Sequence, residues 1–490
     1  MLRLLHLHGR TTLKKPVILN SKIQTIKYLV WDALSALLAW GIFFFYRKLS
    51  VENGRFDDIS NVFHDTHFWW GIILLPIAWC CLYALQGTYK NVYRKARLKE
   101  LQMTFWASLI GVIIIFFSLL LDDNIQSYRN YYVSFLMLFL LHFGLTYIGR
   151  LCITSHTARL IHSRRIGYPT LLVGSGRKAF QTYQELDDQA VYSGNIFVGF
   201  IKVNGSIDSR LLAVMPHLGG ASDINAVIEK HKIEEVIFAI DDCDYAKINS
   251  IIRLLDRRDD VIIKITPDLR DIVYGSVKIN SIFHSPLITI NPRPMEEWQY
   301  SFKRVGDIVV SLLALVLLSP LFLITAVIVK STSPGPVFYA QERIGYRGKP
   351  FKMHKFRSMY VDAESAGPAL SSDDDPRITP FGRIMRKYRL DEIPQFYNVL
   401  KGTMSLVGPR PERQYFIDQI VERAPEYLLL QKVKPGITSW GQVKYGYAEN
   451  VDEMVERLRY DLLYLENMSI ATDIKILLYT VLIILQGRGK

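Results

Sequence analysis

Residues 303–330 read KRVGDIVVSLLALVLLSPLFLITAVIVK, an apolar segment with basic residues at both ends. Its apolar part exceeds the roughly 20 residues that a helix needs to cross the hydrocarbon core of a membrane. Ser319-Pro320 stands near the middle, and a proline there removes a backbone donor and clashes with the preceding turn. We therefore predict that the helix breaks at Ser319 and Pro320 and returns to the side it entered, as a re-entrant hairpin over residues 300–332. A kinked helix that crosses the membrane is the alternative.

Four more apolar segments precede this one, each close to the length of a membrane-spanning helix. They are roughly Ile26–Tyr46, Phe68–Leu85, Met103–Leu121 and Tyr131–Cys152. They predict a four-span transmembrane domain over residues 1–155. Six lysines and arginines stand before or at the start of the first span, the last of them Lys27; five stand in the second connecting loop, and only Arg129 stands in the third. By the positive-inside rule, the N-terminus, the second loop and the chain after the fourth span are cytoplasmic.

Asp32 is the acidic residue inside the first of these segments. An ionisable group deep inside a membrane-spanning helix is costly and marks a functional site. Asp32 lies towards one end of its segment, so we expect it at the membrane–water interface.

The composition limits the classes of ligand. Half of the 490 residues are hydrophobic and the formal net charge is +13. Such a charge suits nucleic acid, anionic lipid or phosphorylated substrates. The basic residues flank apolar segments, and no finger, zipper or RNA-binding signature is found. We therefore expect membrane lipids and phosphorylated ligands as partners, and no nucleic acid.

Residues 165–270 alternate between short apolar strands and helices. Strands are expected at Thr170–Val173, Glu235–Ile240 and Val261–Ile265, with helices after Ser222 and near Tyr245–Arg257. This alternation predicts a small doubly wound, Rossmann-like α/β module.

A glycine turn follows the first of these strands and reads Gly174-Ser175-Gly176-Arg177-Lys178-Ala179. It is a G-x-G-x-x-A variant of the dinucleotide fingerprint, and such turns bind a pyrophosphate at a helix N-terminus. Gly174 and Gly176 are therefore candidates for a nucleotide-binding turn. No acidic residue stands at a secure ribose position, so a structural or regulatory module without a nucleotide is the other interpretation.

Two strand-like runs flank a turn-rich stretch at Gly345–Pro350 and predict a hairpin. On the second strand Lys355 and Arg357 share one face, because side chains alternate with a period of two. Two cations that face the same way suit a phosphate. A solvated strand face would have the same pattern.

An Asp-Glu pair lies between two groups of arginines. Thr379-Pro380 begins a helix on which Arg383 and Arg386 share one side. Asp391-Glu392 follows, and Arg410 lies downstream in Gly408-Pro409-Arg410-Pro411-Glu412. Phosphoryl transfer requires cations around the transferring group, a metal to offset its charge, and a nucleophile held in line. This stretch supplies that mixture, and we expect the arginines together with the metal to keep Asp391 ionised.

From about Phe302 to the C-terminus the chain resembles the bacterial sugar transferases, which are monotopic polyprenyl-phosphate phosphoglycosyl transferases. The matching motifs are KRVGDIVVSL with LLSPLFL, SPGPVFYAQERIG with GKPFKMHKFRSM, DPRITPFGRIMRK with LDEIPQFYNVLKGTMSLVGPRPE, and VKPGITSWGQV. The family implies a small α/β catalytic domain, here residues 333–490. It also implies a two-step reaction. An aspartate attacks the β-phosphate of a UDP-sugar and releases UMP, and polyprenyl phosphate then attacks the aspartyl phosphosugar.

Carried onto this sequence, the resemblance makes Asp391 the nucleophile and Glu392 a ligand of Mg²⁺. It makes Lys355, Arg386 and Arg410 contacts of the phosphates, and Asp461 in RYDLLYLENMS a further polar partner. One departure is Arg389, which stands where the family usually has a small hydroxyl residue. We expect it either to tune substrate choice or to point to solvent.

The predicted fold class is membrane α plus α/β: a four-helix bundle, a Rossmann-like module, and a re-entrant helix with a catalytic domain. This arrangement resembles the large members of the family, which start capsule, exopolysaccharide or O-antigen units with glucose or galactose. The resemblance implies a multi-pass protein of the bacterial inner membrane, with its catalytic domain on the cytoplasmic face and undecaprenyl phosphate as the acceptor. A homodimer through the front half is one arrangement open to it.

Two other functions were weighed. An oxidoreductase that modifies nucleotide sugars would need a second, larger dinucleotide fold with a Tyr-x-x-x-Lys pair, and none follows Pro267. A non-catalytic scaffold or regulator of polysaccharide assembly is the alternative that we keep. Decay of the catalytic domain should strip the Asp-Glu pair or its arginines, and this chain retains both.

Overall fold

The computed structural model describes residues 17–18, 21–50, 63–120, 128–189, 192–203, 206–241, 251, 255, 261–266, 287–290, 295–363, 367, 370, 375–446 and 448–487. These residues fall into two compact units. The first lies within Met1–Cys243 and Val261–Ile290, and the second within Asp244–Asp260 and Asn291–Lys490.

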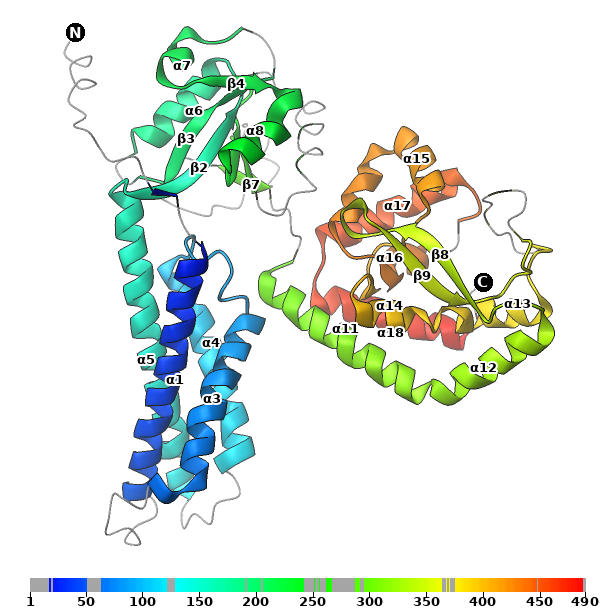
Figure 1. The fold of residues 1–490 in the computed structure, drawn as a ribbon, viewed down its shortest axis with the longest axis horizontal. Coiled ribbons are helices and arrows are strands. Elements are labelled where there is room, and N and C mark those ends of the chain that lie inside the picture. The colour runs from blue at the N-terminus through cyan, green and yellow to red at the C-terminus, as the bar shows by residue number, and fades with distance from the viewer. Residues whose placement is uncertain are drawn as a thin grey trace. The chain divides into compact units, whose positions relative to one another are not determined.

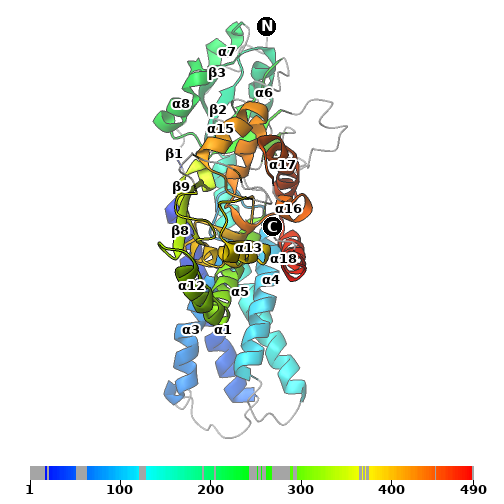
Figure 2. The same ribbon diagram turned by 90° about the vertical axis from the view of Figure 1, so that its right-hand side faces the viewer.

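The first unit begins with a bundle of long apolar helices (Figures 1 and 2). These are α1 (Ser21–Ser50), α3 (Thr66–Leu85), α4 (Arg97–Ile115) continued by the π-helix η2 (Phe116–Leu120), and α5 (Tyr128–His162). Among the described residues, four helices are long and apolar enough to cross a membrane, which confirms the four predicted segments. Aromatic side chains such as Trp40, Phe43 and Trp79 fill the space between them. Such helices are apolar nearly all round because lipid takes the place of water outside the bundle.

Asp32 is fully buried inside the bundle, and its position at the membrane–water interface stays a prediction. Arg150 of α5 donates from Nε to Asp32 Oδ1 at 2.8 Å and from Nη2 to Oδ2 at 2.7 Å. The same guanidinium donates to Thr104 at 2.9 Å and lies 4.0 Å from the centre of the Tyr83 ring. An acidic residue is tolerated here because Arg150, which lies 118 residues away on the fourth span, neutralises it. The sequence pattern of one helix does not reveal that partner.

The rest of the first unit is the α/β module. Its strands are β1 (Val17–Ile18), β2 (Ile166–Val173), β3 (Asn195–Lys202), β4 (His217–Gly220), β5 (Glu235–Phe238), β6 (Ile262–Ile265) and β7 (Ile288–Ile290). The sheet runs β4-β3-β2-β5-β6-β7 with β1 beside β2, and all pairs are parallel except β6 with β7. This is the order of the doubly wound dinucleotide-binding fold, so the Rossmann-like prediction is confirmed.

The helices of the module are α6 (Arg177–Asp187), α7 (Ser209–Val214), the short turn η3 (Ala221–Asp223) and α8 (Ile224–His231). The helix expected near Tyr245–Arg257 lies outside the described residues, apart from Ile251 and Leu255. A basic loop between α3 and α4 holds the module to the bundle. Arg94 of that loop forms an ion pair of 2.6 Å with the buried Glu235 and lies over the Tyr168 ring.

The second unit begins with α11 (Glu297–Leu317) and α12 (Ser319–Thr332), which meet at an angle of 62°. The break falls at the predicted Ser319 and Pro320, where Ser319 Oγ donates to the Val316 carbonyl at 2.7 Å. The freed backbone of the kink thus gains a side-chain partner.

Both arms of this bent pair contact the same globular body (Figure 1). On α11, Lys303 donates to the Val407 carbonyl at 2.9 Å and Arg304 to the Val399 carbonyl at 2.6 Å. On α12, the Phe322 ring lies 4.8 Å from the Phe356 ring, centre to centre. Since one body holds both arms, this packing favours re-entry over a crossing. The re-entry itself stays a prediction.

The globular body contains a hairpin of β8 (Phe338–Ile344) and β9 (Pro350–Phe356), as predicted. A second small sheet pairs β10 (Ser405–Val407) with β11 (Gly436–Thr438) in parallel. The helices and 3-10 turns around them are η4 (Tyr346–Gly348), α13 (Pro380–Lys387), η5 (Leu390–Glu392), α14 (Gln395–Lys401), α15 (Gln414–Arg423), η6 (Pro425–Lys432), α16 (Trp440–Lys444), α17 (Val451–Glu466) and α18 (Ile470–Leu485). A core that includes Val399, Met404 and Ile476 joins α14, β10 and α18.

Candidate active site

The Asp-Glu pair lies on η5, directly after α13. Thr379 caps α13 by accepting a hydrogen bond from the Gly382 amide at 3.0 Å, as the sequence predicts. After α13 ends, Arg389 adopts a left-handed backbone conformation with φ of 53° and turns the chain. This turn brings Asp391 and Glu392 inside the domain, where they are only 6% and 4% exposed. Two adjacent buried carboxylates are costly unless cations accompany them.

Three cations from separate segments meet Glu392. Lys355 of β9 donates from Nζ to Glu392 Oε1 at 3.2 Å. Arg389 donates to Oε2 at 3.2 Å, and Arg410, in the loop after β10, lies 3.5 Å from Oε1. The sequence prediction named Lys355 and Arg410 for this site, and the structure brings both to the dyad. The sequence allowed two roles for Arg389, and the structure turns its side chain to Glu392, away from solvent.

The two carboxyl groups of the dyad differ in their electrostatics. Burial alone would raise the pKa of Glu392, but Lys355, Arg389 and Arg410 outweigh burial and hold that pKa well below its usual range. Burial raises the pKa of Asp391, and the negative charge of Glu392 adds to this effect while Lys355 opposes it. The cations therefore offset only part of the cost of burying Asp391, and its ionisation with a bound metal stays a prediction. The cations contact Glu392, and Asp391 bears the cost of desolvation.

Of the remaining predicted phosphate ligands, Arg386 acts on the dyad through its charge. Its Nε donates to Ser358 Oγ at 3.0 Å, and its charge lowers the pKa of Asp391. Arg383 lies on the same helix with an exposed side chain.

Arg357 does not share the environment of Lys355, which corrects the expectation that both face one phosphate. It lies just beyond the end of β9, is buried, and donates to the Ser333 and Pro334 carbonyls at 2.6 and 2.8 Å. Its guanidinium thereby ties the end of the bent helix pair to the hairpin.

The part of Asp461 as a further polar partner of the site stays a prediction. Asp461 is buried on α17 and accepts a hydrogen bond from the Gly441 amide at 2.9 Å, at the start of α16. Burial raises the pKa of this carboxyl group. Asp461 therefore supports the first turn of α16, whose N-cap is Ser439.

A buried ion-pair cluster beside Arg410 was missed by sequence reasoning. Glu412 accepts from Arg343 of β8 and Arg457 of α17, both at 2.8 Å. The Arg343 guanidinium also donates to the Pro411 carbonyl at 3.1 Å. These contacts fix the chain on the C-terminal side of Arg410. The only sequence signal was the position of Glu412 within the Gly-Pro-Arg-Pro-Glu motif.

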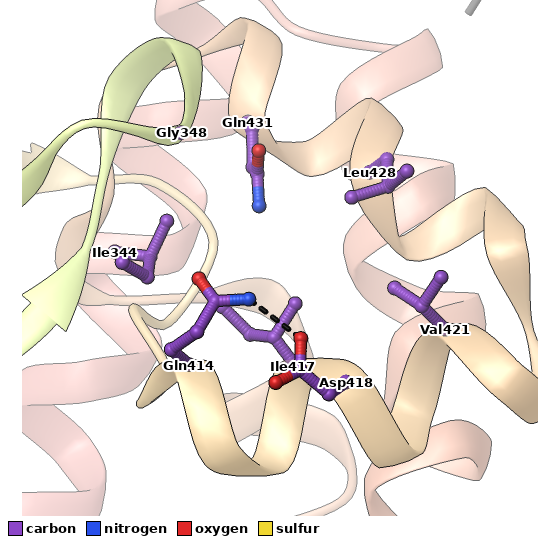
Figure 3. Close-up of a pocket in the computed structure, with 8 residues that line it drawn as sticks. All are labelled: Ile344, Gly348, Gln414, Ile417, Asp418, Val421, Leu428 and Gln431. Carbon is purple, nitrogen blue, oxygen red and sulfur yellow. Dashed lines mark hydrogen bonds between the residues drawn. The ribbon is translucent and has the colours of Figure 1, made fainter.

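Figure 3 shows a cavity of about 240 Å³ lined by Ile344, Gly348, Gln414, Ile417, Asp418, Val421, Leu428 and Gln431. It lies at the turn of the β8–β9 hairpin. Lys355 is five residues along β9 from Pro350, or about 17 Å at the usual rise of a strand. The cavity is therefore separate from the dyad.

The donor atoms at the dyad suit one kind of metal site. Among the described residues, no three His, Cys, Asp or Glu side chains come together in a way that would hold a metal ion. Mg²⁺ is commonly bound by one or two carboxylates together with waters and substrate phosphates. Asp391 and Glu392 fit a Mg²⁺ site of this kind, which waters and substrate phosphates would complete.

The fold and the site define a membrane protein whose globular domain holds a carboxylate dyad among cations, an arrangement suited to a phosphorylated ligand. The known proteins agree. A family model described as bacterial sugar transferase matches residues 298–487, and one described as a CoA-binding domain matches residues 84–267.

Three relatives illustrate the similarity. A UDP-N-acetylgalactosamine-undecaprenyl-phosphate N-acetylgalactosaminephosphotransferase of Aeromonas hydrophila is 43% identical over 216 residues, 44% of this chain and 50% of that protein. A UDP-glucose:undecaprenyl-phosphate glucose-1-phosphate transferase of Escherichia coli (strain K12) is 37% identical over 253 residues, 51% of this chain and 54% of that protein. An uncharacterized sugar transferase of Haemophilus influenzae is 32% identical over 337 residues, 65% of this chain and 69% of that protein. The chain thus spans about half the length of the first two. It belongs to the bacterial sugar transferase family.

Proposed function

We propose that this protein transfers a sugar 1-phosphate from a UDP-sugar to undecaprenyl phosphate and releases UMP. The observation that carries the proposal is the buried Asp391–Glu392 dyad, with Lys355, Arg389 and Arg410 on Glu392. The names of the relatives give glucose and N-acetylgalactosamine as transferred sugars. Galactose is the further sugar favoured by the resemblance.

The chemistry proceeds in two displacements at the β-phosphorus of the donor. A carboxylate oxygen of Asp391 forms a bond to this phosphorus, the bond to the oxygen of UMP breaks, and UMP leaves with that electron pair. An oxygen of undecaprenyl phosphate then attacks the same phosphorus and displaces Asp391. The product is undecaprenyl diphosphate sugar, and the aspartate is restored.

The residues around Asp391 have distinct tasks in this scheme. Arg410 and Lys355 contact the phosphate oxygens and offset the charge that develops on them. The cations that now pair with Glu392 also draw an anionic donor to the site. The negative charge of a bound pyrophosphate would disfavour the ionised form of Asp391. Arg386 counters this effect, because its charge lowers the pKa of Asp391.

Mg²⁺ is the cofactor that we propose, with Glu392 as its protein ligand. When bound, it would offset phosphate charge as a Lewis acid. The low pKa of Glu392 keeps this carboxylate ionised and able to bind a cation.

The membrane segments support a proposal for the location of the reaction. The positive-inside rule places the chain after α5 in the cytoplasm, and a re-entrant α11–α12 pair keeps the dyad on that side, where UDP-sugars are made. We therefore propose the cytoplasmic face of a bacterial inner membrane. We further propose that the reaction starts a capsule, exopolysaccharide or O-antigen unit. The protein is also proposed to act as a homodimer.

The test is UMP release by the purified full-length protein with Mg²⁺, undecaprenyl phosphate and one UDP-sugar at a time. Asp391→Asn should lose activity by at least about 10³-fold, since the nucleophile is removed. Asp418→Asn is the matched control, because Asp418 is exposed on α15 at the separate cavity. Release of UDP would mean that the sugar moves without its phosphate. Inactivity of the wild type with every donor would favour the scaffold alternative.

A further inference from the structure

The α/β module has the strand order of a dinucleotide-binding fold, a glycine turn after its first strand, and a match to a family model described as a CoA-binding domain. All three suggest a nucleotide at the turn. In such folds the ligand lies at the carboxyl ends of the strands where the strand order reverses. Here that place lies between the ends of β2 and β5, since β2 pairs with β3 on one side and β5 on the other.

We propose that this place is filled by the protein's own Asp241 carboxylate, and that the module binds neither a dinucleotide nor coenzyme A at its glycine turn. Asp241 follows the end of β5 by three residues. Its Oδ1 accepts a hydrogen bond of 2.6 Å from the backbone amide of Lys178, in the first turn of α6. In a dinucleotide-binding protein, amides in this first turn bind the pyrophosphate.

The two glycines of the turn are explained by contacts within the protein. A side chain at Gly176 would place its Cβ 1.7 Å from Asp241 Oδ2. A Cβ at Gly174 would lie 2.0 Å from the Ala239 carbonyl oxygen, and Gly174 has φ of 142°. Both glycines are therefore needed so that the segment after β5 approaches the turn. The space that a glycine normally leaves for a phosphate is taken by Asp241.

The end of α6 is also capped without a ligand. Gly176 occupies the N-cap position and has no side chain that accepts a hydrogen bond. Asp241, 63 residues away in sequence, supplies the missing acceptor to Lys178, the second residue of the helix. A carboxylate beside the positive end of a helix is stabilised in the same way as a phosphate would be.

A further feature argues against a nucleotide. Dinucleotide-binding folds usually hold the ribose through an acidic residue about 20 residues beyond the glycine turn. The described residues that end β3 are Lys202 and Val203, and neither can accept from a ribose hydroxyl with its side chain. A phosphate would in addition meet the negative charge of Asp241 at the turn. The glycine signature thus reflects the close approach of the segment after β5 to the turn before α6.

The test is hydrogen–deuterium exchange of the peptide 174–180 in the full-length protein. Exchange in the wild type should not change when NAD or coenzyme A is added at millimolar concentration. In Asp241→Ala, the exchange of this peptide should become about fivefold faster, the effect expected when a helix loses a capping side chain. Asp223→Ala is the matched control, because Asp223 accepts from the Gly220 amide before α8. It should leave the peptide unchanged.

Two results would overturn the proposal. One is slower exchange of this peptide in the wild type with NAD or coenzyme A, which would place a ligand at the turn. The other is unchanged exchange in Asp241→Ala, which would mean that the carboxylate does not cap α6. The wild-type measurement needs no variant, so it decides even if Asp241→Ala is unstable. Neither measurement depends on the transferase activity.

Discussion

Two buried clusters of charged residues, one in each unit, differ in their balance of charge. In the membrane bundle, Asp32 and Glu100 are paired with Arg150 and Lys95. At the dyad, Asp391 and Glu392 are faced by four cations.

Those four are Lys355, Arg386, Arg389 and Arg410. A cluster with equal numbers of acids and bases needs no further ion, whereas an excess of cations in a buried place provides for an anion. The comparison teaches that burial alone does not mark the active site. The excess of positive charge distinguishes the dyad from the cluster in the bundle.

The largest effect is expected from breaking the balanced cluster. Asp32→Asn leaves Arg150 without its charged partner inside the bundle and should destabilise the protein by about 3–5 kcal/mol. The measurement is the free energy of unfolding of the full-length protein in detergent micelles. The double variant Asp32→Leu with Arg150→Met should recover most of the loss, because it removes both charges. If the double variant were no more stable than Asp32→Asn, the loss in Asp32→Asn would not come from the unpaired charge of Arg150.

A smaller effect on stability, but a large one on activity, is expected at the dyad. Arg410→Gln removes one of three cations on Glu392, so the other two still neutralise it. UMP release should fall by about 10²–10³-fold, the usual cost of losing a group that stabilises developing charge. The free energy of unfolding should change by less than in Asp32→Asn. The reverse order of the two stability losses would refute the difference between the clusters.

The pH dependence of UMP release tests the raised pKa of Asp391. Burial favours the protonated form of this group, and the nucleophile acts only when ionised. Activity should therefore fall on acidification with a midpoint above the usual aspartate value of about 3.9. Arg386→Gln removes a cation that lowers this pKa, so the midpoint should move up by as much as about one pH unit. Glu392 has a lowered pKa and stays ionised over the whole range. A midpoint that moves down in Arg386→Gln would contradict this assignment.

The smallest effect is expected at Arg389, which places a third cation on Glu392. Arg389→Ser keeps the dyad and the two other cations, so UMP release should fall by about tenfold, one to two kcal/mol in the barrier. The relative rates with UDP-glucose, UDP-galactose and UDP-N-acetylgalactosamine are the second measurement. A change in their ratio would assign Arg389 to substrate choice. Equal losses with all donors would assign it to the charge balance alone.

Several parts of this structure could be predicted from local sequence patterns. The four apolar segments, the break at Ser319 and Pro320, and the β8–β9 hairpin depend on hydrophobicity, proline geometry and turn residues, which act over a few positions. The cap of α13 at Thr379 is another local signal. Boundaries were less exact, since α5 extends well beyond the apolar segment that predicted it.

Other features depended on pairs of residues far apart in the chain. The sequence pattern suggested that Lys355 and Arg357 act together, but Arg357 binds the Ser333 and Pro334 carbonyls. Asp461 matched a motif, and its carboxylate accepts from the Gly441 amide in the first turn of α16. In each case a side chain of suitable chemistry found a backbone partner that only the folded chain provides.

The sequence by itself determined the membrane segments, the doubly wound module and the presence of an Asp-Glu pair among arginines, because these follow from local composition and spacing. Only the tertiary structure decided which charges meet. It paired Asp32 with Arg150, placed three cations on Glu392, and brought Asp241 to the glycine turn. Electrostatic energies depend on distance and burial in space, and neither quantity can be obtained from the order of residues along the chain.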